Sequence, residues 1–255
     1  MRLLSWTYLA IAYAFVLLPV VVLVVFSFQD GRLPVPPFRG FSLQWYDKVL
    51  SDTGLMTALW HSALVAFVSS ALALVMGFLA AHALARVHLP GSAVWRGLLI
   101  APMTVSYLII ALGLLATFNQ TGVKLSLWTA GIGHVVINLP LCFAVAYAAM
   151  GDHQKTAERA ARDLGASELR VLWHISAPML APALAAAFFL SVTFSWDEFI
   201  IAFLLTRFEV TLPVELWSML RSGLSPATNA IGALVFLISA CGVVVMEMTL
   251  LRRPK

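Results

Sequence analysis

Residues 6–28 read WTYLAIAYAFVLLPVVVLVVFSF, a stretch that contains no Asp, Glu, Lys or Arg. A helix needs about 20 consecutive apolar residues to cross the hydrocarbon core of a bilayer. The run is longer than the apolar region of a signal peptide, and no small-x-small cleavage pattern ends it. It therefore predicts a retained membrane-spanning helix.

Five further runs without these charged residues follow along the chain. Mean hydropathy is +0.93 and only 11% of the residues are charged, which is too little polar surface for a water-soluble core of this size. Barrel strands alternate with a period of two, whereas these runs are continuously apolar. We predict an all-α polytopic membrane protein, a single transmembrane domain over residues 1–255. Its six spanning helices are expected within residues 3–29, 53–85, 97–123, 125–151, 171–196 and 222–246.

The basic residues predict the orientation of the chain. Positive charges gather in cytoplasmic loops of membrane proteins. If the first helix starts inside, ten Lys and Arg residues are cytoplasmic and six are external, so both termini and the segment around residue 160 are predicted to be cytoplasmic. The main external loop covers residues 30–52, where LQWYDKVL (43–50) could form a short helix at the membrane interface.

Enzymatic chemistry finds little support in the motifs. The sequence has no G-x-x-x-x-G-K-[ST] loop for phosphates, no H-E-x-x-H and no G-x-S-x-G elbow. Cys142 and Cys241 fall in predicted helices and are interpreted as packing residues rather than a disulfide or redox pair. Helix two carries Ala73, Gly77 and Ala81 at four-residue spacing, which favours close helix packing.

One dense charged segment interrupts this apolar chain. Eight charged residues fall between Asp152 and Arg170, within TAERAARDLGASELRVLWHISAP (156–178) and the residues just before it. Few helix breakers precede Gly165, so a short helix, a turn at that glycine and a second helix are expected. On physical grounds alone, an amphipathic loop lying on the membrane is an equally good interpretation.

The spacing in this segment resembles the signature of the permease subunits of ABC importers. That signature is E-A-A, three residues, Gly, nine residues, then I-x-L-P. Here Ala160 and Ala161 are followed by residues 162–164, Gly165, residues 166–174 and ISAP (175–178). Two positions depart from it: Arg159 occupies the place of the signature Glu, and Ala177 that of the Leu.

The resemblance implies a type I importer permease (MetI-like) fold and a coupling helix, within a loop at about 152–176, that docks on a separate ATPase. Small residues would permit close docking, and charged residues would make contacts at the rim, with Glu158 able to substitute for the missing Glu. The residues implied in ATPase coupling are Glu158, Arg159, Ala160, Ala161, Asp163, Gly165 and Ala166.

Other segments look like the spermidine/putrescine branch of these permeases. They are FSLQWYDKVL (41–50), HSALVAFVSSALALVMGFLAAHALAR (61–86), GHVVINLP (133–140), FSWDEFIIAFL (194–204) and TLPVELWSMLRSGLSPATNA (211–230). His61 departs from the pattern, in which Asn usually precedes the Ser.

Two adjacent carboxylates interrupt the fifth apolar run. A charge at the bilayer centre costs about 2.5–3.5 kcal/mol, so such residues usually face a cavity, a partner or a pathway. Neighbouring helical residues point about 100° apart, so both face one pathway only if the helix breaks there. We expect Asp197 to face the substrate path, with Trp196 offering a cation-π surface. Glu198 is expected to pair with another subunit or with an arginine such as Arg207 or Arg221; the alternative is that both carboxylates cap a helix or form an intersubunit ion pair.

The resulting prediction is the inner-membrane permease subunit of a bacterial ABC importer for a cationic amine such as putrescine or spermidine. Opine-like solutes, aminophosphonates and other small solutes are alternative substrates, and an ion-coupled secondary carrier is an alternative class. The chain is expected to need no cofactor or metal, since a partner ATPase would bind ATP and Mg. Expected partners are a second, related permease chain, two ATPase subunits, a periplasmic or extracellular binding protein and membrane lipid, without nucleic acid.

Overall fold

The computed structural model describes residues 2–88 and 90–251, and within these ranges it contains helices and no strand. Only an isolated bridge joins Gln29 to Phe41. The predicted all-α fold is therefore confirmed. The α-helices are α1 (Arg2–Ser27), α2 (Gln44–Ser51), α3 (Thr53–Arg86), α4 (Ser92–Ile100), α5 (Tyr107–Thr121), α6 (Leu127–Ala149), α7 (Asp152–Asp163), α8 (Glu168–Val171), α9 (Ala177–Trp196), α10 (Ile200–Leu205), α11 (Leu212–Ser222) and α12 (Pro226–Leu251).

Among the residues that the structure describes, five helical segments are long and apolar enough to cross a membrane, and a bent pair makes a sixth when it is counted as one span. The bent pair corresponds to the third predicted run. It breaks between residues 104 and 107 with a bend of 103°. Pro102 lies in the 3₁₀ turn that follows α4, and Ser106 caps α5 by accepting a hydrogen bond from the N–H of Ile109. Proline and a local N-cap both favour starting a new helix over continuing the old one.

One compact unit contains residues up to 58 and residues 215–245. It comprises α1, α2, most of α12 and parts of α3 and α11. The hydroxyls of Ser27 and Tyr46 lie 2.6 Å apart and join α1 to α2, and the indole N–H of Trp45 donates to the carbonyl of Gln29. The short helix expected at residues 43–50 is therefore present as α2, and tertiary contacts hold it.

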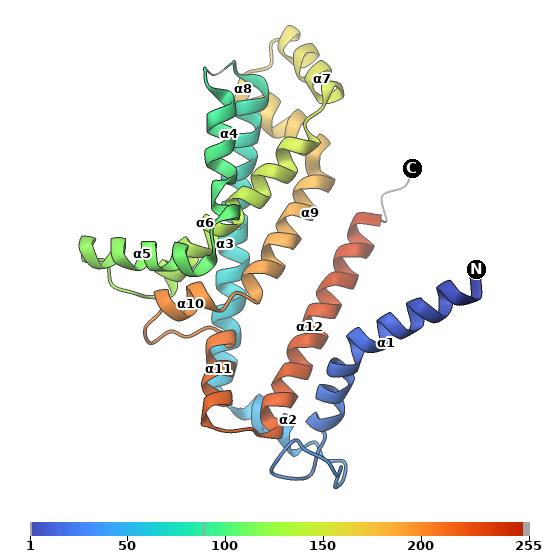
Figure 1. Cartoon of the computed structure of the whole chain (residues 1–255). Helices are drawn as coiled ribbons and strands as arrows, with labels where there is room; N and C mark the ends of the chain where they lie inside the picture. The colour runs from blue at the N-terminus through green and yellow to red at the C-terminus, as the bar shows by residue number, and fades with distance from the viewer. Residues whose placement is uncertain (1, 89, 252–255) are drawn as a thin grey trace. The chain divides into compact units, whose positions relative to one another are not determined.

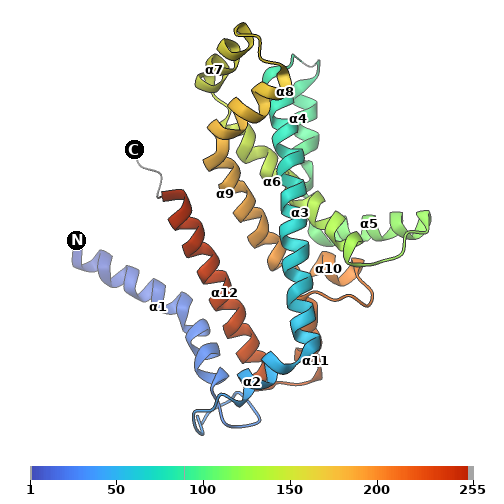
Figure 2. The same cartoon turned by 180° about the vertical axis from the view of Figure 1, so that it is seen from behind.

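The other compact unit contains residues 59–214 and the segment from 246. In it α3, α4, α6 and α9 run together, with α7 and α8 at their shared end, while α5 turns away from α4 (Figures 1 and 2). The predicted small-residue face is used here. Ala73 and Ala81 are fully buried, and a Cβ added to Gly77 would lie 2.7 Å from the backbone nitrogen of Phe143 on α6. The single-domain organisation over residues 1–255 stays a prediction.

Gly77 supplies a direct test of this packing. Gly77→Ala should lower the melting temperature of the purified protein, because the new methyl group meets backbone that cannot rotate away; overpacking typically costs about 1–3 kcal/mol. Gly113→Ala is the matched control, since a Cβ at that helical glycine meets nothing within 4 Å. An unchanged melting temperature for Gly77→Ala would contradict the close approach of α3 and α6.

Candidate functional site

The charged segment forms the expected helix, turn and helix. Asp152 lies in the first turn of α7 and Arg162 in the last, which matches the helix dipole. The side-chain oxygen of Gln154 accepts from the N–H of Gly151 and helps to cap the start. Gly165 has a φ of +86°, a left-handed conformation that favours glycine, and α8 begins three residues later. The turn predicted at Gly165 is confirmed.

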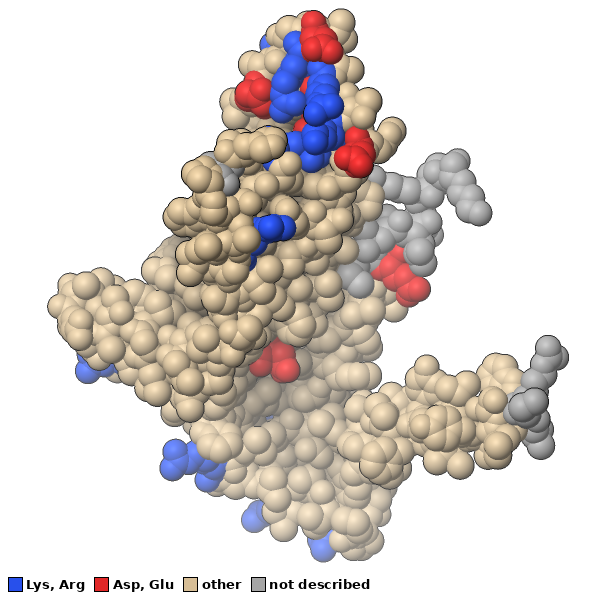
Figure 3. Space-filling view, turned by 45° about the horizontal axis from the view of Figure 1, so that its top comes forward, with Lys and Arg blue, Asp and Glu red and all other residues tan. Residues whose placement is uncertain are grey.

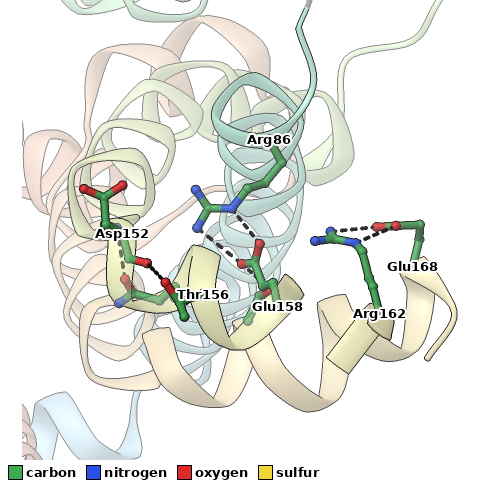
Figure 4. A network of polar contacts seen from close by, with 9 residues as sticks. Arg86, Asp152, Thr156, Glu158, Arg162 and Glu168 are labelled. Carbon is green, nitrogen blue, oxygen red and sulfur yellow. Dashed lines mark hydrogen bonds and ion pairs between the residues drawn. The ribbon is translucent and has the colours of Figure 1, made fainter. Parts of the chain in front are cut away.

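Glu158 points into the protein from α7. Its side chain is 1% exposed, and its carboxylate accepts from Arg86 Nε at 2.6 Å and from Arg86 Nη2 at 3.3 Å. The hydroxyl of Ser176, in the π-helical turn between α8 and α9, donates to the same carboxylate at 2.8 Å. Figure 4 shows Arg86 reaching Glu158 from the end of α3. The side chain of Glu158 is therefore held inside the unit and not at the surface, and its expected contact with an ATPase stays a prediction.

These contacts set the charge state of Glu158. Burial acts to raise the pKa of its carboxyl, but the hydrogen bonds from Arg86 and Ser176 and the positive charge of Arg86 outweigh burial, so the pKa lies below its ordinary value. A lowered pKa in the folded state stabilises the fold above the unfolded pKa of about 4.3. This contribution is lost as the pH falls through the folded pKa.

A second ion pair closes the turn between α7 and α8. The guanidinium of Arg162 donates to both carboxylate oxygens of Glu168, at 2.7 Å and 2.9 Å. These side chains are 30% and 73% exposed, so water screens the pair and its contribution to stability is small.

The other residues implied in ATPase coupling remain at or near the surface. Arg159, Ala160, Asp163 and Gly165 are exposed, whereas Ala161 and Ala166 are half-buried. A Cβ added to Gly165 meets nothing within 4 Å. The structure thus brings all of these residues to one helix and the turn that ends it, with a surface open to a partner.

The two adjacent carboxylates lie where the chain breaks between α9 and α10. Asp197 follows the last residue of α9 and is exposed, and Trp196, just before it, is half-buried. Glu198 is 6% exposed and accepts hydrogen bonds from the N–H groups of Ile200, Ile201 and Ala202. Glu198 therefore caps α10. The capping alternative describes it. Among the described residues of this unit, Arg207 makes no ion pair with Glu198, and the pairing of Glu198 with Arg221 or with another subunit stays a prediction.

A polar network that sequence analysis missed lies beside this break. His134 on α6 is 1% exposed; its Nδ1 contacts the hydroxyl of Ser195, which lies 3.2 Å from that of Ser69 on α3. His134 Nε2 is 3.8 Å from a carboxylate oxygen of Glu198. The signal available in the sequence was GHVVINLP (133–140), a buried His and Asn within an apolar run. This network joins α3, α6 and α9 next to the break in which Asp197 lies.

A hollow of about 290 Å³ lies between α3 and α6. Trp60 and His61 line it from α3, Trp128 lines it from α6, and Glu209 from the segment after α10 completes one side. The carboxylate of Glu209 also accepts from the N–H of Leu127 at the start of α6. This carboxylate, like Arg86 and Ser176, was not singled out from the sequence.

Residues 73–250 match the sequence family described as the inner-membrane component of binding-protein-dependent transport systems. The chain belongs to this family. It is 31% identical over 256 residues to the spermidine/putrescine transport system permease protein PotC of Escherichia coli K12, covering 100% of this chain and 96% of that one. It is also 31% identical to the putrescine transport system permease protein PotI of the same strain, covering 92% and 86% of the two chains. The predicted family, including its spermidine/putrescine branch, is confirmed.

Solved structures agree on the fold of this permease. A chain of a bacterial ABC transporter that imports the acidic polysaccharide alginate has a TM-score of 0.69 at 20% identity, covering 100% of this chain and 96% of that one. A chain of the MetNI methionine ABC transporter has a TM-score of 0.62 at 16% identity, covering 77% and 94%. The MetI-like permease fold is confirmed, and the family is one of transport permeases rather than enzymes.

The buried ion pair predicts a double-mutant result. Arg86→Met and Glu158→Leu should each loosen α7 by about 3 kcal/mol, because each leaves the other charge buried without a partner, and the double variant should lose less than the sum. Hydrogen exchange of the α7 amides measures this. Arg162→Gln is the control for an exposed pair and should change the exchange free energy by less than about 1 kcal/mol. Additive effects of the two single variants would show that no pair couples α3 to α7.

Replacing each of the two carboxylates at the α9–α10 break should have a different effect on stability. Glu198→Ala should lower the free energy of unfolding by about 1 kcal/mol through loss of the α10 cap, whereas Asp197→Asn, at an exposed position, should leave it unchanged. Thermal unfolding of the purified permease provides the measurement. Equal destabilisation by both substitutions would contradict their different roles.

Proposed function

We propose that this permease forms half of the translocation pathway of an ATP-driven importer for a cationic amine such as putrescine or spermidine. The observation that carries the proposal is its similarity over the whole chain to PotC, whose name states that it transports spermidine and putrescine. A periplasmic or extracellular binding protein would deliver the substrate. A second, related permease chain would complete the pathway, and two ATPase subunits would bind ATP and Mg, so this chain itself would carry no cofactor.

In this proposal the permease lies in a bacterial cytoplasmic membrane with both termini and α7 on the cytoplasmic side. The excess of Lys and Arg in the segments assigned to that side supports this orientation. The known structure of an alginate ABC transporter in complex with a substrate-bound periplasmic protein supports delivery from the opposite side.

The contacts of α7 suggest how ATP-driven movement would reach the membrane helices. Arg159, Ala160, Asp163 and Gly165 would meet the ATPase, with Ala161 and Ala166 permitting a close approach. Glu158 would instead hold α7 to the end of α3 through Arg86 and to the start of α9 through Ser176. A displacement of α7 would then move both helices and switch the pathway between inward-facing and outward-facing states.

The geometry of Asp197 supports its role in the substrate path. It is a carboxylate exposed at a break in an apolar helix, and such a charge is costly unless it faces water, a partner or a cation. Trp196 would offer a cation-π surface to the ammonium group. The carboxylate of Glu198 caps α10 by accepting backbone hydrogen bonds. We therefore assign attraction of the substrate to Asp197, and to Glu198 the role of holding the start of α10 in place.

An opine-like solute, an aminophosphonate or another small solute would use the same architecture. Identifying the ligand retained by the cognate binding protein decides between these substrates and the amines. An ion-coupled carrier would need no ATPase, so co-purification of the permease with an ATPase and vanadate-sensitive uptake separate the importer from that class.

Asp197→Asn should reduce amine uptake by at least about tenfold in proteoliposomes that contain the complete importer, because the ammonium group loses its counter-charge in a poorly solvated path. Expression, thermal stability and ATP hydrolysis stimulated by the binding protein should stay at wild-type levels. Asp47→Asn, an exposed carboxylate on α2, is the control and should leave uptake unchanged.

Wild-type uptake by Asp197→Asn would refute the role of this residue. Glu209→Gln tests the alternative that the substrate path uses the hollow between α3 and α6. The amide oxygen of the new side chain can still accept from the N–H of Leu127, while the charge is lost. A defect in Glu209→Gln without one in Asp197→Asn would move the path to the hollow between α3 and α6.

A further inference from the structure

A groove of about 1160 Å³ lies where α3, the start of α4 and the α7–α8 turn meet. Its lining is strongly basic: it includes four Lys and Arg side chains and two histidines against a single carboxylate. Figure 3 shows Lys and Arg side chains gathered at this end of the unit. The charged and titratable residues that line it are His82, Arg86, His88, Lys155, Arg159, Arg162 and Glu168.

Internal ion pairs neutralise only part of this charge. Arg86 is paired with Glu158 and Arg162 with Glu168. Across the residues that the structure describes, no carboxylate lies within 4.0 Å of the charged nitrogens of Lys155 or Arg159. Lys155 is half-buried and Arg159 is exposed, so two positive charges remain available at the groove.

Apolar side chains project beside these charges. Leu164, at the end of α7, is 89% exposed, and Leu169 on α8 is 68% exposed and lines the groove. Gly165 lies between them with open space over its α-carbon. The turn therefore exposes two leucine side chains beside the unpaired positive charges of Lys155 and Arg159. This composition is typical of a protein interface, in which an apolar centre is surrounded by polar and charged residues.

The reversed charge at position 159 makes this surface different from the signature of the family. The signature has Glu where this chain has Arg159, and Glu158 does not replace it at the surface because Arg86 and Ser176 hold it inside. The coupling surface therefore has the opposite sign at this position, and a complementary partner must have the opposite sign as well.

We infer that the ATPase surface that receives α7 is acidic, with carboxylates over Lys155 and Arg159 beside an apolar pocket for Leu164. This inference rests on the proposed role of α7 in ATPase coupling. An anionic lipid surface is the other possible counter-charge. It fits less well, because α7 also exposes Asp152 and Asp163, which a uniformly negative surface would repel, whereas a protein places its charges individually.

The test is the affinity of the cognate ATPase for the permease pair in nanodiscs of a zwitterionic lipid, measured over a range of salt concentrations. Wild-type affinity should fall as salt rises. Lys155→Glu/Arg159→Glu should bind at least about tenfold more weakly at low salt, because like charges would face each other, and its salt dependence should flatten or reverse. Leu164→Ser should weaken binding without altering the salt dependence.

Arg170→Glu is the matched control, since Arg170 is exposed on α8 but does not line the groove. It should keep wild-type affinity. Replacing an exposed carboxylate of the ATPase by Lys should restore binding to the double variant, which would identify the partner residue. Because both substituted side chains carry no internal ion pair, folding should be unaffected, and thermal unfolding verifies this.

Wild-type affinity in the double variant, or an equal loss in Arg170→Glu, would overturn the inference. So would a loss that appears only in nanodiscs containing phosphatidylglycerol, which would assign the groove to lipid. If the wild-type permease binds no ATPase at all, the proposed function itself fails; if it binds and the double variant binds equally well, only the acidic surface is refuted.

Discussion

The ion pair between Arg86 and Glu158 determines how the charged helix α7 is presented. Two charges buried together at the end of a membrane helix are stable only while both are present and hydrogen-bonded, so the register of α7 is fixed around this contact. Neighbouring helical residues point about 100° apart. Holding Glu158 inward therefore turns Arg159 outward, so that the exposed face of α7 has a positive charge at position 159.

The same arrangement recurs at the adjacent carboxylates Asp197 and Glu198. At the break after α9, Glu198 is held inside by three backbone N–H groups while Asp197 is left exposed. In both places one residue of the pair serves the fold and its neighbour is free for a partner. The exposed charges of Arg159 and Asp197 are thus positioned by the internal contacts of the neighbouring residues Glu158 and Glu198.

Sequence alone predicted the elements that depend on local composition. Charge-free runs located the spanning segments, and Gly165 located the turn between α7 and α8, because span length and left-handed backbone are local properties. The bend in the third run has its sequence signal in Pro102, but hydropathy contains no information on the direction that the backbone takes after that residue. The internal role of Glu158 was missed, and capping by Glu198 was only one of two alternatives, because both roles depend on contacts made after folding; Arg86 is 72 positions from Glu158 in the chain. A carboxylate in an apolar segment predicts a compensating partner, but the sequence composition does not show whether that partner lies within the same chain or in another molecule.

In the proposed importer, the Arg86–Glu158 contact would link a docked ATPase to the membrane helices. ATP hydrolysis and amine uptake measured together in proteoliposomes containing the Glu158→Leu importer test this link most directly. We expect hydrolysis to continue, because the outer face of α7 would still meet the ATPase, while the amount of amine imported per ATP falls sharply. An unchanged ratio of uptake to hydrolysis, with wild-type amounts of assembled complex, would contradict it.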